Sequence, residues 1–185
     1  MELHPWTSTT DAPDRPSYAL IDIDPGPDTT WDELLVLARL YRTALEHLGV
    51  RAHPKVTGKR GLQIWIGIAR GPTFDDTRDW VDGLSRAIGA TVPDLVSWEW
   101  AKRARKGKAR LDYTQNAINK TLVAPYSTRP APGAPVSMPI AWEELDDPEL
   151  RPDRWTLRDV PDRIAAKGDP FAAVLADEQT LPPLG

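Results

Sequence analysis

The chain has 185 residues, 41% hydrophobic and 27% charged, which is typical of one folded domain with a real core. Cysteine is absent, which excludes disulfides, thiolate catalysis and cysteine-based zinc sites and fits a reducing, cytoplasmic setting. The formal net charge is −4, so contact with a polyanion would need a local patch of Lys and Arg. We see neither an apolar run of about 18 residues nor a secretory leader pattern, so no membrane association is expected.

The first part of the chain carries the clearest secondary-structure signals. Residues 1–17 contain prolines and little periodicity, so they are predicted to be an irregular lead-in. Residues 18–24 are a short apolar run that ends in alternating carboxylates, which predicts a strand stopped by the Pro-Gly-Pro after it. Thr30 with Glu33 is a capping box, and the apolar residues that follow at helical spacing predict a helix closed by Gly49.

The later elements are predicted from alternation, helical periodicity and turn residues. Strands are expected at 50–56, 62–68, 110–113 and 121–125, and helices at 74–90, 142–145, 157–166 and 170–177. The pattern β-α-β-β-α-β-β predicts an α/β or α+β fold, with antiparallel pairing wherever short turns join two strands. We expect a single domain over residues 1–185, with an acidic C-terminal segment at 146–185.

Asp22 and Asp24 are the sharpest local signal. At positions i and i+2 of a strand, they point to the same face of the sheet. Two carboxylates so close repel each other unless a cation lies between them, and oxygen ligands suit Mg²⁺ or Mn²⁺. Asp112, at the end of another short strand, is the third ligand that such a site needs. The alternative is a set of exposed acids at strand ends.

A basic glycine turn joins the two predicted strands at 50–56 and 62–68. Its sequence is Thr57-Gly58-Lys59-Arg60-Gly61. Glycines let main-chain N–H groups approach a ligand closely, and the threonine and the two cations add donors, so the turn suits a triphosphate. It lacks the spacing of a Walker A motif, and a plain hairpin turn is the alternative.

Cations gather before the strand that carries Asp112. They are Lys102, Arg103, Arg105, Lys106, Lys108 and Arg110, and Trp98 and Trp100 lie close to them in sequence. Cations mixed with aromatic residues are typical of a surface that binds nucleic acid. An ordinary solvated face explains the same run equally well.

Six segments, in the same order along the chain, resemble the polymerase domain of bacterial DNA ligase D, a member of the archaeo-eukaryotic primase superfamily. They are ELHPW (2–6), LIDIDPG (20–26), KVTGKRGLQ (55–63), RKGKARLDYTQN (105–116), APYSTRPAPGAPVSMPIAWEEL (124–145) and RWTLRDVPDRI (154–164). Taken together these segments are far more specific than any one motif. The resemblance implies a primase-polymerase core, in which an RRM-like, mainly antiparallel sheet is flanked by helices.

The resemblance also implies roles for individual residues. The metal-binding carboxylate triad falls on Asp22, Asp24 and Asp112, holding Mn²⁺ or Mg²⁺ for nucleotidyl transfer to DNA ends in non-homologous end joining. The implied nucleotide contacts are His4, Thr57, Arg60, Gln63, Gln115 and Arg129. Lys59 of the glycine turn is expected to add a further cation there. The basic run, read as a nucleic-acid surface, supplies the expected DNA contacts Lys102, Arg103, Arg105, Lys106 and Lys108. The implied partners are DNA ends, a nucleoside triphosphate, and an end-joining ligase or end-binding protein.

Two departures from the family pattern bear on activity. Gln63 stands where the family usually has His, and an amide donates a hydrogen bond but carries no positive charge. The family also has roughly a further hundred residues before the ELHPW segment, so an N-terminally shortened domain is expected. No K-x-D-G motif for a lysine adenylate is present in this chain, so it is not expected to ligate DNA.

Two rival functions remain open. A catalytically impaired domain that binds DNA ends or a repair partner fits Gln63 and the shortened N-terminal part. An unrelated metal-dependent nuclease or phosphatase shares the carboxylates but leaves the other matching segments unexplained.

Overall fold

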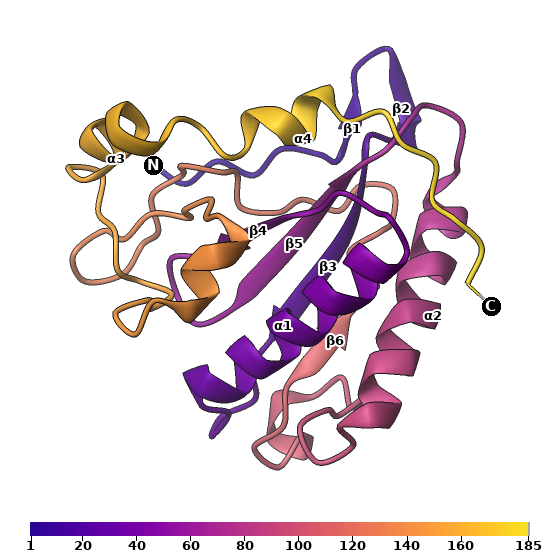
Figure 1. Ribbon diagram of the computed structural model, residues 1–185, viewed down its shortest axis with the longest axis horizontal. Coiled ribbons are helices and arrows are strands. Elements are labelled where there is room, and N and C mark those ends of the chain that lie inside the picture. Colours follow the sequence, from indigo (N-terminus) through magenta and orange to yellow (C-terminus); the bar gives the residue numbers. More distant parts are fainter. Residues whose placement is uncertain (185) are drawn as a thin grey trace.

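A four-stranded antiparallel sheet lies at the centre of the molecule (Figure 1). The computed structural model describes residues 1–184. The strand order is β4 (His53–Val56), β5 (Leu62–Gly67), β3 (Tyr18–Asp24) and β6 (Arg110–Asp112). With its two long helices the chain order is βαββαβ, the split arrangement of ferredoxin-like and RRM-like sheets. The predicted α/β fold with an RRM-like antiparallel sheet is confirmed.

Two amphipathic helices cover one face of this sheet. Helix α1 (Trp31–His47) begins at the predicted capping box of Thr30 and Glu33. Helix α2 (Phe74–Thr91) begins with a second capping box, in which Thr73 and Asp76 bind each other's main-chain N–H groups. Each box satisfies helix N–H groups that have no partner within the helix, so the sequence itself determines where both helices start.

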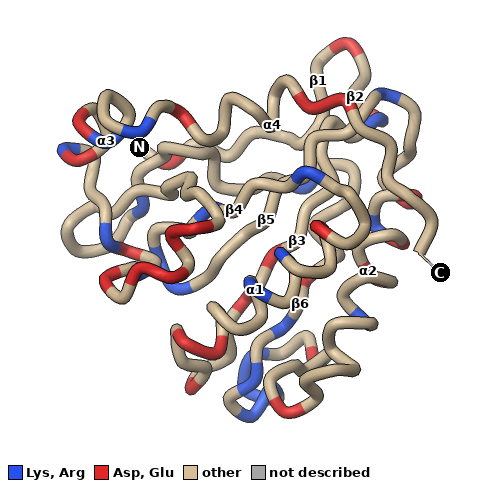
Figure 2. The backbone as a smooth tube through the Cα atoms, in the orientation of Figure 1, with Lys and Arg blue, Asp and Glu red and all other residues tan. Residues whose placement is uncertain are grey.

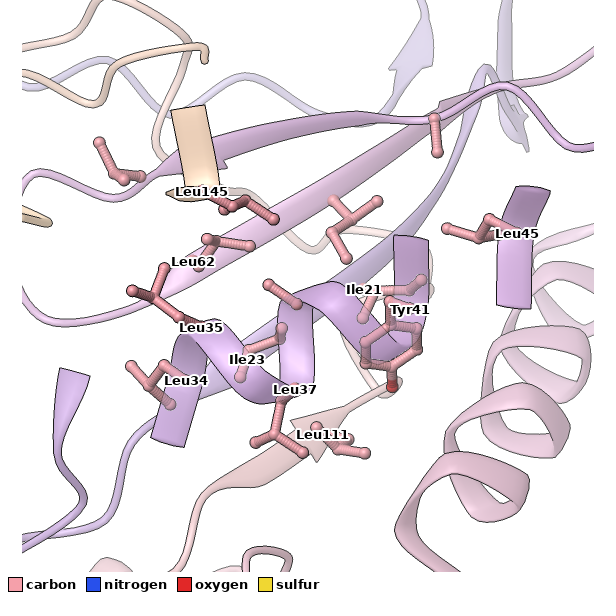
Figure 3. Packing of buried hydrophobic residues seen from close by; sticks show 14 of the residues in the cluster. Ile21, Ile23, Leu34, Leu35, Leu37, Tyr41, Leu45, Leu62, Leu111 and Leu145 are labelled. Carbon is pink, nitrogen blue, oxygen red and sulfur yellow. The ribbon is translucent and has the colours of Figure 1, made fainter. Parts of the chain in front are cut away.

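Strict alternation along β3 separates the two faces of the sheet. Ala19, Ile21 and Ile23 are fully buried and pack in the main core with residues of both long helices. Figure 3 shows Ile21 and Ile23 beside Leu37 and Tyr41 of α1. The intervening residues of β3 therefore face the other side of the sheet, where the two aspartates lie.

The C-terminal segment covers the apolar half of that other face. Helix α4 (Ala172–Ala176) packs on β5, and Val174 joins Leu20 and Trp65 in a second, smaller core. Gly67 allows this close approach, because a Cβ atom there would clash with the main-chain oxygen of Val174. The opposite half of the face, toward the C-terminal end of β3, carries polar side chains.

Two predictions were wrong. The N-terminal segment is not irregular, because β1 (Ser8–Thr9) and β2 (Ala12–Pro16) form a two-stranded antiparallel hairpin. Residues 121–125 form no strand and make a single bridge, between Thr121 and Trp6. Strand formation depends on the partner strands that packing supplies, so local propensity was a poor guide in both segments.

The remaining short helices lie close to their predicted positions. The structure has a 3₁₀ turn at η2 (Trp142–Asp146) and a helix at α3 (Val160–Lys167). A further 3₁₀ turn, η1 (Lys102–Ala104), lies where no helix was predicted. Within residues 1–184, no helix combines the length and the apolar character that crossing a membrane requires.

Candidate active site

One row of side chains crosses all four strands of the central sheet. Asp22 on β3 is paired with Asp112 on β6 and with Gln63 on β5, and Gln63 is paired with Lys55 on β4. Residues directly opposite each other in antiparallel strands project to the same face, so these four side chains share one face. Asp24, two residues beyond Asp22, projects to the same face. The strand register thus brings together three carboxylates that are far apart in sequence.

Asp24 is held by two cations that differ in burial. Lys102 Nζ lies 2.9 Å from Asp24 Oδ1, and this lysine side chain is 59% exposed. Arg105 Nη1 lies 2.9 Å from Asp24 Oδ2, and the arginine side chain is 4% exposed. Arg105 also donates to the main-chain oxygens of Glu99 and Trp100. The buried arginine therefore ties the loop before β6 to the end of β3.

Asp112 is held by its own loop. Its carboxylate accepts hydrogen bonds from the main-chain N–H and the hydroxyl of Thr114, at 3.0 and 2.6 Å, and from Gln115 Nε2 at 3.3 Å. Arg110 Nη2 lies 3.6 Å from the same carboxylate. Gln115 was expected to contact a nucleotide, but in the structure its side chain donates to Asp112, a candidate metal ligand.

The electrostatics of Asp22 reflect burial and crowding by like charges. Burial, and then the charge of Asp24, raise the pKa of Asp22 to about 7, with Asp112 adding to the rise. A hydrogen bond from Gln63 Nε2 to Asp22 Oδ1, at 3.1 Å, and the charge of Lys55 act in the opposite direction. A cation bound between these carboxylates would relieve the repulsion that raises this pKa.

Lys55 is a site residue that the sequence reasoning missed. Its side chain is fully buried, and its ammonium donates to Ser137 Oγ at 2.5 Å and lies 5.9 Å from the ring centre of Trp65. Burial lowers the pKa of Lys55 to about 7, although Asp22 acts to raise it. A lysine within an apolar strand was the available signal, since lysine is almost never fully buried without a partner.

The carboxylates offer the right donor chemistry for a hard divalent cation, namely oxygen ligands on one face. Within residues 1–184, however, no three acidic or histidine side chains are gathered closely enough to hold a metal ion as they stand. Asp24 is turned toward Lys102 and Arg105, and Asp112 toward Thr114. Metal binding would therefore require Asp24 to exchange the exposed ion pair with Lys102 for the cation.

A cavity of about 260 Å³ adjoins the polar half of the sheet face. Eight of its lining residues are charged or polar: Asp22, Asp24, Thr57, Lys59, Arg60, Gln63, Lys102 and Arg129. The structure therefore brings the glycine turn, the loop arginine and two of the aspartates around one space. His4 and Gln115 do not line this cavity. His4 is exposed, with Nε2 3.3 Å from Glu2 Oε2.

The glycine turn is closed by Thr57 and tied to its surroundings by two arginines. The Thr57 hydroxyl accepts from Gly61 N and donates to Gly61 O, both at 3.1 Å. Arg60 donates to the main-chain oxygen of Gly26, just after Asp24, at 2.7 Å. Arg129 donates to Thr57 O at 3.0 Å and forms an ion pair with Glu2. The turn is therefore held against the carboxylates, while Lys59 lies exposed at the rim of the cavity.

The predicted DNA-binding cluster is not uniform. Figure 2 shows its cations gathered in the loop before β6. Lys102, Arg103 and Lys106 are exposed, whereas Arg105 is buried and bound to Asp24. Lys108 donates to Pro93 O at 2.9 Å. Only the exposed members of the predicted cluster are therefore accessible to solvent, whereas Arg105 holds the loop against Asp24.

Asn116 is a second residue whose role only the structure reveals. Its side-chain amide donates to Leu20 O and accepts from Leu20 N, both at 2.8 Å. The amide thus pairs with β3 in the way a neighbouring strand would, beyond the end of β6. This pairing satisfies buried main-chain groups next to the carboxylates.

The combination of an RRM-like sheet, three carboxylates on its open face and an adjoining basic glycine turn defines the primase-polymerase class. Residues 1–171 match the family described as LigD, primase-polymerase domain, and the chain belongs to this family. It is 32% identical over 183 residues to the multifunctional non-homologous end joining protein LigD of Pseudomonas aeruginosa, covering 98% of this chain and 22% of that protein. It is 30% identical over 169 residues to the bifunctional LigD of Bacillus subtilis, covering 91% and 28%.

A solved structure agrees with this assignment. The polymerase domain of Mycobacterium tuberculosis ligase D, in complex with DNA, superposes with a TM-score of 0.81 at 30% identity. The superposition covers 89% of this chain and 57% of that domain. The chain therefore spans little more than half of the solved polymerase domain and less than a third of the two curated relatives.

Proposed function

We propose that the chain transfers nucleotides to DNA ends in a metal-dependent reaction of non-homologous end joining, as expected for a LigD polymerase domain. The observation that carries this proposal is the shared sheet face of Asp22, Asp24 and Asp112 next to a cavity lined by Arg60 and Arg129. Membership of the LigD primase-polymerase family supports the reaction class, and the DNA in the solved relative supports the substrate.

The cavity suits a triphosphate better than a whole nucleotide. Its volume of about 260 Å³ lies below the roughly 300–1,000 Å³ that is usual for sites enclosing a small molecule. Lys59, Arg60 and Arg129 would offset phosphate charge there, and the close main chain of Gly61 would admit the phosphate oxygens. The base and the sugar would then remain outside the cavity, toward the DNA.

The carboxylates are the residues that would hold Mg²⁺ or Mn²⁺. When bound, such ions supply positive charge that lowers the pKa of the primer 3′-hydroxyl and stabilises the leaving pyrophosphate. Arg105 and the Thr114 hydroxyl orient Asp24 and Asp112 through direct contacts. Lys55 places an amine in the same row of side chains, and its positive charge, when the amine is protonated, limits the repulsion on Asp22.

Primer extension tests this proposal directly. A recessed DNA duplex, a labelled ribonucleoside triphosphate and Mn²⁺ or Mg²⁺ should yield extended product with the 185-residue chain. Asp112→Asn should reduce extension by roughly a hundredfold or more, because a carboxylate that shares the cation is removed. Asp79→Asn, which changes an exposed acid on α2, is the matched control and should leave extension unchanged. Degradation of the primer without added nucleotide would indicate a nuclease instead.

A second candidate is a non-catalytic domain that binds DNA ends. The observation that favours it is that the Gln63 amide is already engaged by Asp22, where the family usually has His. If Gln63 only weakens catalysis, Gln63→His should raise incorporation by roughly tenfold, equal to about 1.4 kcal/mol of transition-state stabilisation. DNA-end binding without extension by either protein would support the second candidate.

A further inference from the structure

Trp100 presents an indole ring to solvent beside the candidate active site. The residue is 65% exposed, whereas Trp98, two residues earlier, packs against the main core. The guanidinium carbon of Arg110 lies 4.7 Å from the centre of the Trp100 ring. Arg110 is itself buried and donates to Trp98 O at 2.9 Å, so one face of the indole rests on a fixed cation. The other face is open.

The position of Trp100 is tied to the carboxylates by two arginines. Arg105 donates to Trp100 O at 3.0 Å with one nitrogen and to Asp24 Oδ2 at 2.9 Å with another. Arg110 is the strand partner of Asp24 across β3 and β6. Both contacts are made by buried arginines, so the ring is held in a defined place relative to Asp24.

An exposed aromatic ring in these surroundings suits a nucleobase. A base stacks on an indole whatever its sequence, and a cation behind the ring adds to the attraction. Lys102, Arg103 and Lys106 are exposed in the same loop and suit the phosphates of a strand that passes the ring. A free nucleotide could stack on the ring without using these loop cations. The presence of the cations in the same loop therefore favours a polynucleotide as the ligand.

We propose that the open face of Trp100 stacks on an unpaired base of the DNA strand whose end lies at Asp22, Asp24 and Asp112. This inference rests on the proposed DNA-binding function and specifies where the strand is held. Trp100 would act as a positioning residue, because it contacts a base near the strand end while the carboxylates act on the reacting groups.

Single-strand binding without metal or nucleotide tests the proposal. The probes are a fluorescent oligothymidylate and an abasic strand of the same length, which keeps the phosphates and lacks the bases. Trp100→Ala should weaken oligothymidylate binding about tenfold, within the range measured for removal of one stacking partner, and should leave abasic binding unchanged. Trp100→Phe should retain most of the affinity, and Leu157→Ala, an exposed apolar residue elsewhere, should have no effect.

Three outcomes would contradict the proposal, each in a different way. Equal affinity of the wild type and Trp100→Ala for oligothymidylate would overturn the stacking proposal while leaving the DNA-binding function standing. No DNA binding by the wild type would overturn the proposed function itself, and the stacking proposal with it. If Trp100→Ala weakened binding of a free ribonucleoside triphosphate but not of the strand, the ring would belong to the nucleotide site. Melting temperatures within about 2 °C of the wild type would verify folding, as expected for an exposed position.

Discussion

The guanidinium of Arg105 lies 2.9 Å from Asp24 Oδ2 and 3.2 Å from the main-chain oxygen of the same residue. Arg105 is buried, while the second cation on Asp24, Lys102, is largely exposed. One carboxylate thus has a structural partner and an exchangeable partner. The two cations of this site should therefore differ sharply in what they contribute to stability.

Arg105→Met should lower the free energy of unfolding by about 2–3 kcal/mol, because it leaves a partly buried carboxylate and three main-chain carbonyl groups without their donor. Lys102→Met should cost less than about 1 kcal/mol, since exposed ion pairs contribute little. Urea unfolding at pH 7 measures both values. Equal costs would contradict the structural role assigned to Arg105.

Divalent metal should stabilise the protein through the three carboxylates. At a Mn²⁺ concentration one hundred times the dissociation constant, the free energy of unfolding should rise by about 2.7 kcal/mol, and chelation should reverse it. Asp112→Asn should lose most of this gain. The metal-free variant should not be less stable on electrostatic grounds, because the charge of Asp112 contributes to the raised pKa of Asp22. Thermal melting with and without Mn²⁺ measures this gain in stability. If Asp112→Asn gained as much stability from Mn²⁺ as the wild type, the metal would bind elsewhere.

Substitution of Gly58 tests how tightly the glycine turn is packed, and Gly49 provides the matched control. Both have left-handed backbones, with φ of 72° and 68°, but an added Cβ at Gly58 would lie 2.9 Å from the Val136 main chain, while Gly49 has open space. Gly49→Ala should cost about 1 kcal/mol for its backbone conformation alone. Gly58→Ala should cost about 3 kcal/mol because overpacking is added. Similar costs on urea unfolding would show that the turn can relax away from Val136.

Glu144 should make the protein sensitive to acid. Burial acts to raise the pKa of Glu144, but hydrogen bonds from Arg163 and from the Ala141 main chain outweigh it and hold that pKa at about 2. Because the folded pKa lies below the ordinary value of 4.5, this contribution is complete above pH 4.5 and disappears as the pH falls toward 2. The shift corresponds to a contribution of about 3 kcal/mol to the free energy of unfolding.

The variant Glu144→Gln tests this linkage. The stability difference between the wild type and the variant should be largest near pH 7 and should shrink by pH 3, as measured by urea unfolding at both values. Glu143→Gln, at a neighbouring and much more exposed position, is the control and should differ little from the wild type. A pH-independent difference for Glu144→Gln would mean that the carboxylate titrates normally in the folded protein.

The exposed loop cations should determine the salt dependence of DNA binding. Changing Lys102, Arg103 and Lys106 to Gln should reduce the slope of log K against log salt by up to about 0.9 for each phosphate of duplex DNA that is no longer neutralised. Arg105 is left in place because its substitution would disturb the loop. The same change at Arg151 and Arg158, which are exposed elsewhere, should leave the slope unchanged. An unaltered slope in the loop variant would make the loop an ordinary solvated face.

Local patterns in the sequence predicted most of the regular structure and part of the site. Alternation in residues 18–24 predicted that Asp22 and Asp24 share a face, and the register with β5 and β6 shows it. The same two-residue period along β5 puts Gln63 on the face of Asp22, whose carboxylate its amide contacts. These features depend on the two-residue period of a strand, which neighbouring residues determine by themselves. The catalytic and binding roles of these residues stay predictions.

These local patterns did not predict which charged side chains are buried. Arg105 and Lys106 are consecutive cations in one basic run, yet the first is buried against Asp24 and the second is exposed. Lys55 lies within a segment that resembles the family, but no local pattern indicates that its buried side chain joins the row of Asp22. Whether a cation is a surface group or a buried partner depends on which distant acceptors it meets.

The sequence by itself determined the capped helices, the alternating strands and the residue types available for metal and phosphate. Only the tertiary structure decided that Asp112 lies opposite Asp22, that Arg129 meets the glycine turn, and that the ring of Trp100 stays open over Arg110. The reason is physical. Helix caps and strand alternation arise from contacts between residues a few positions apart, whereas these pairings join residues up to 90 positions apart and form only when the whole core packs.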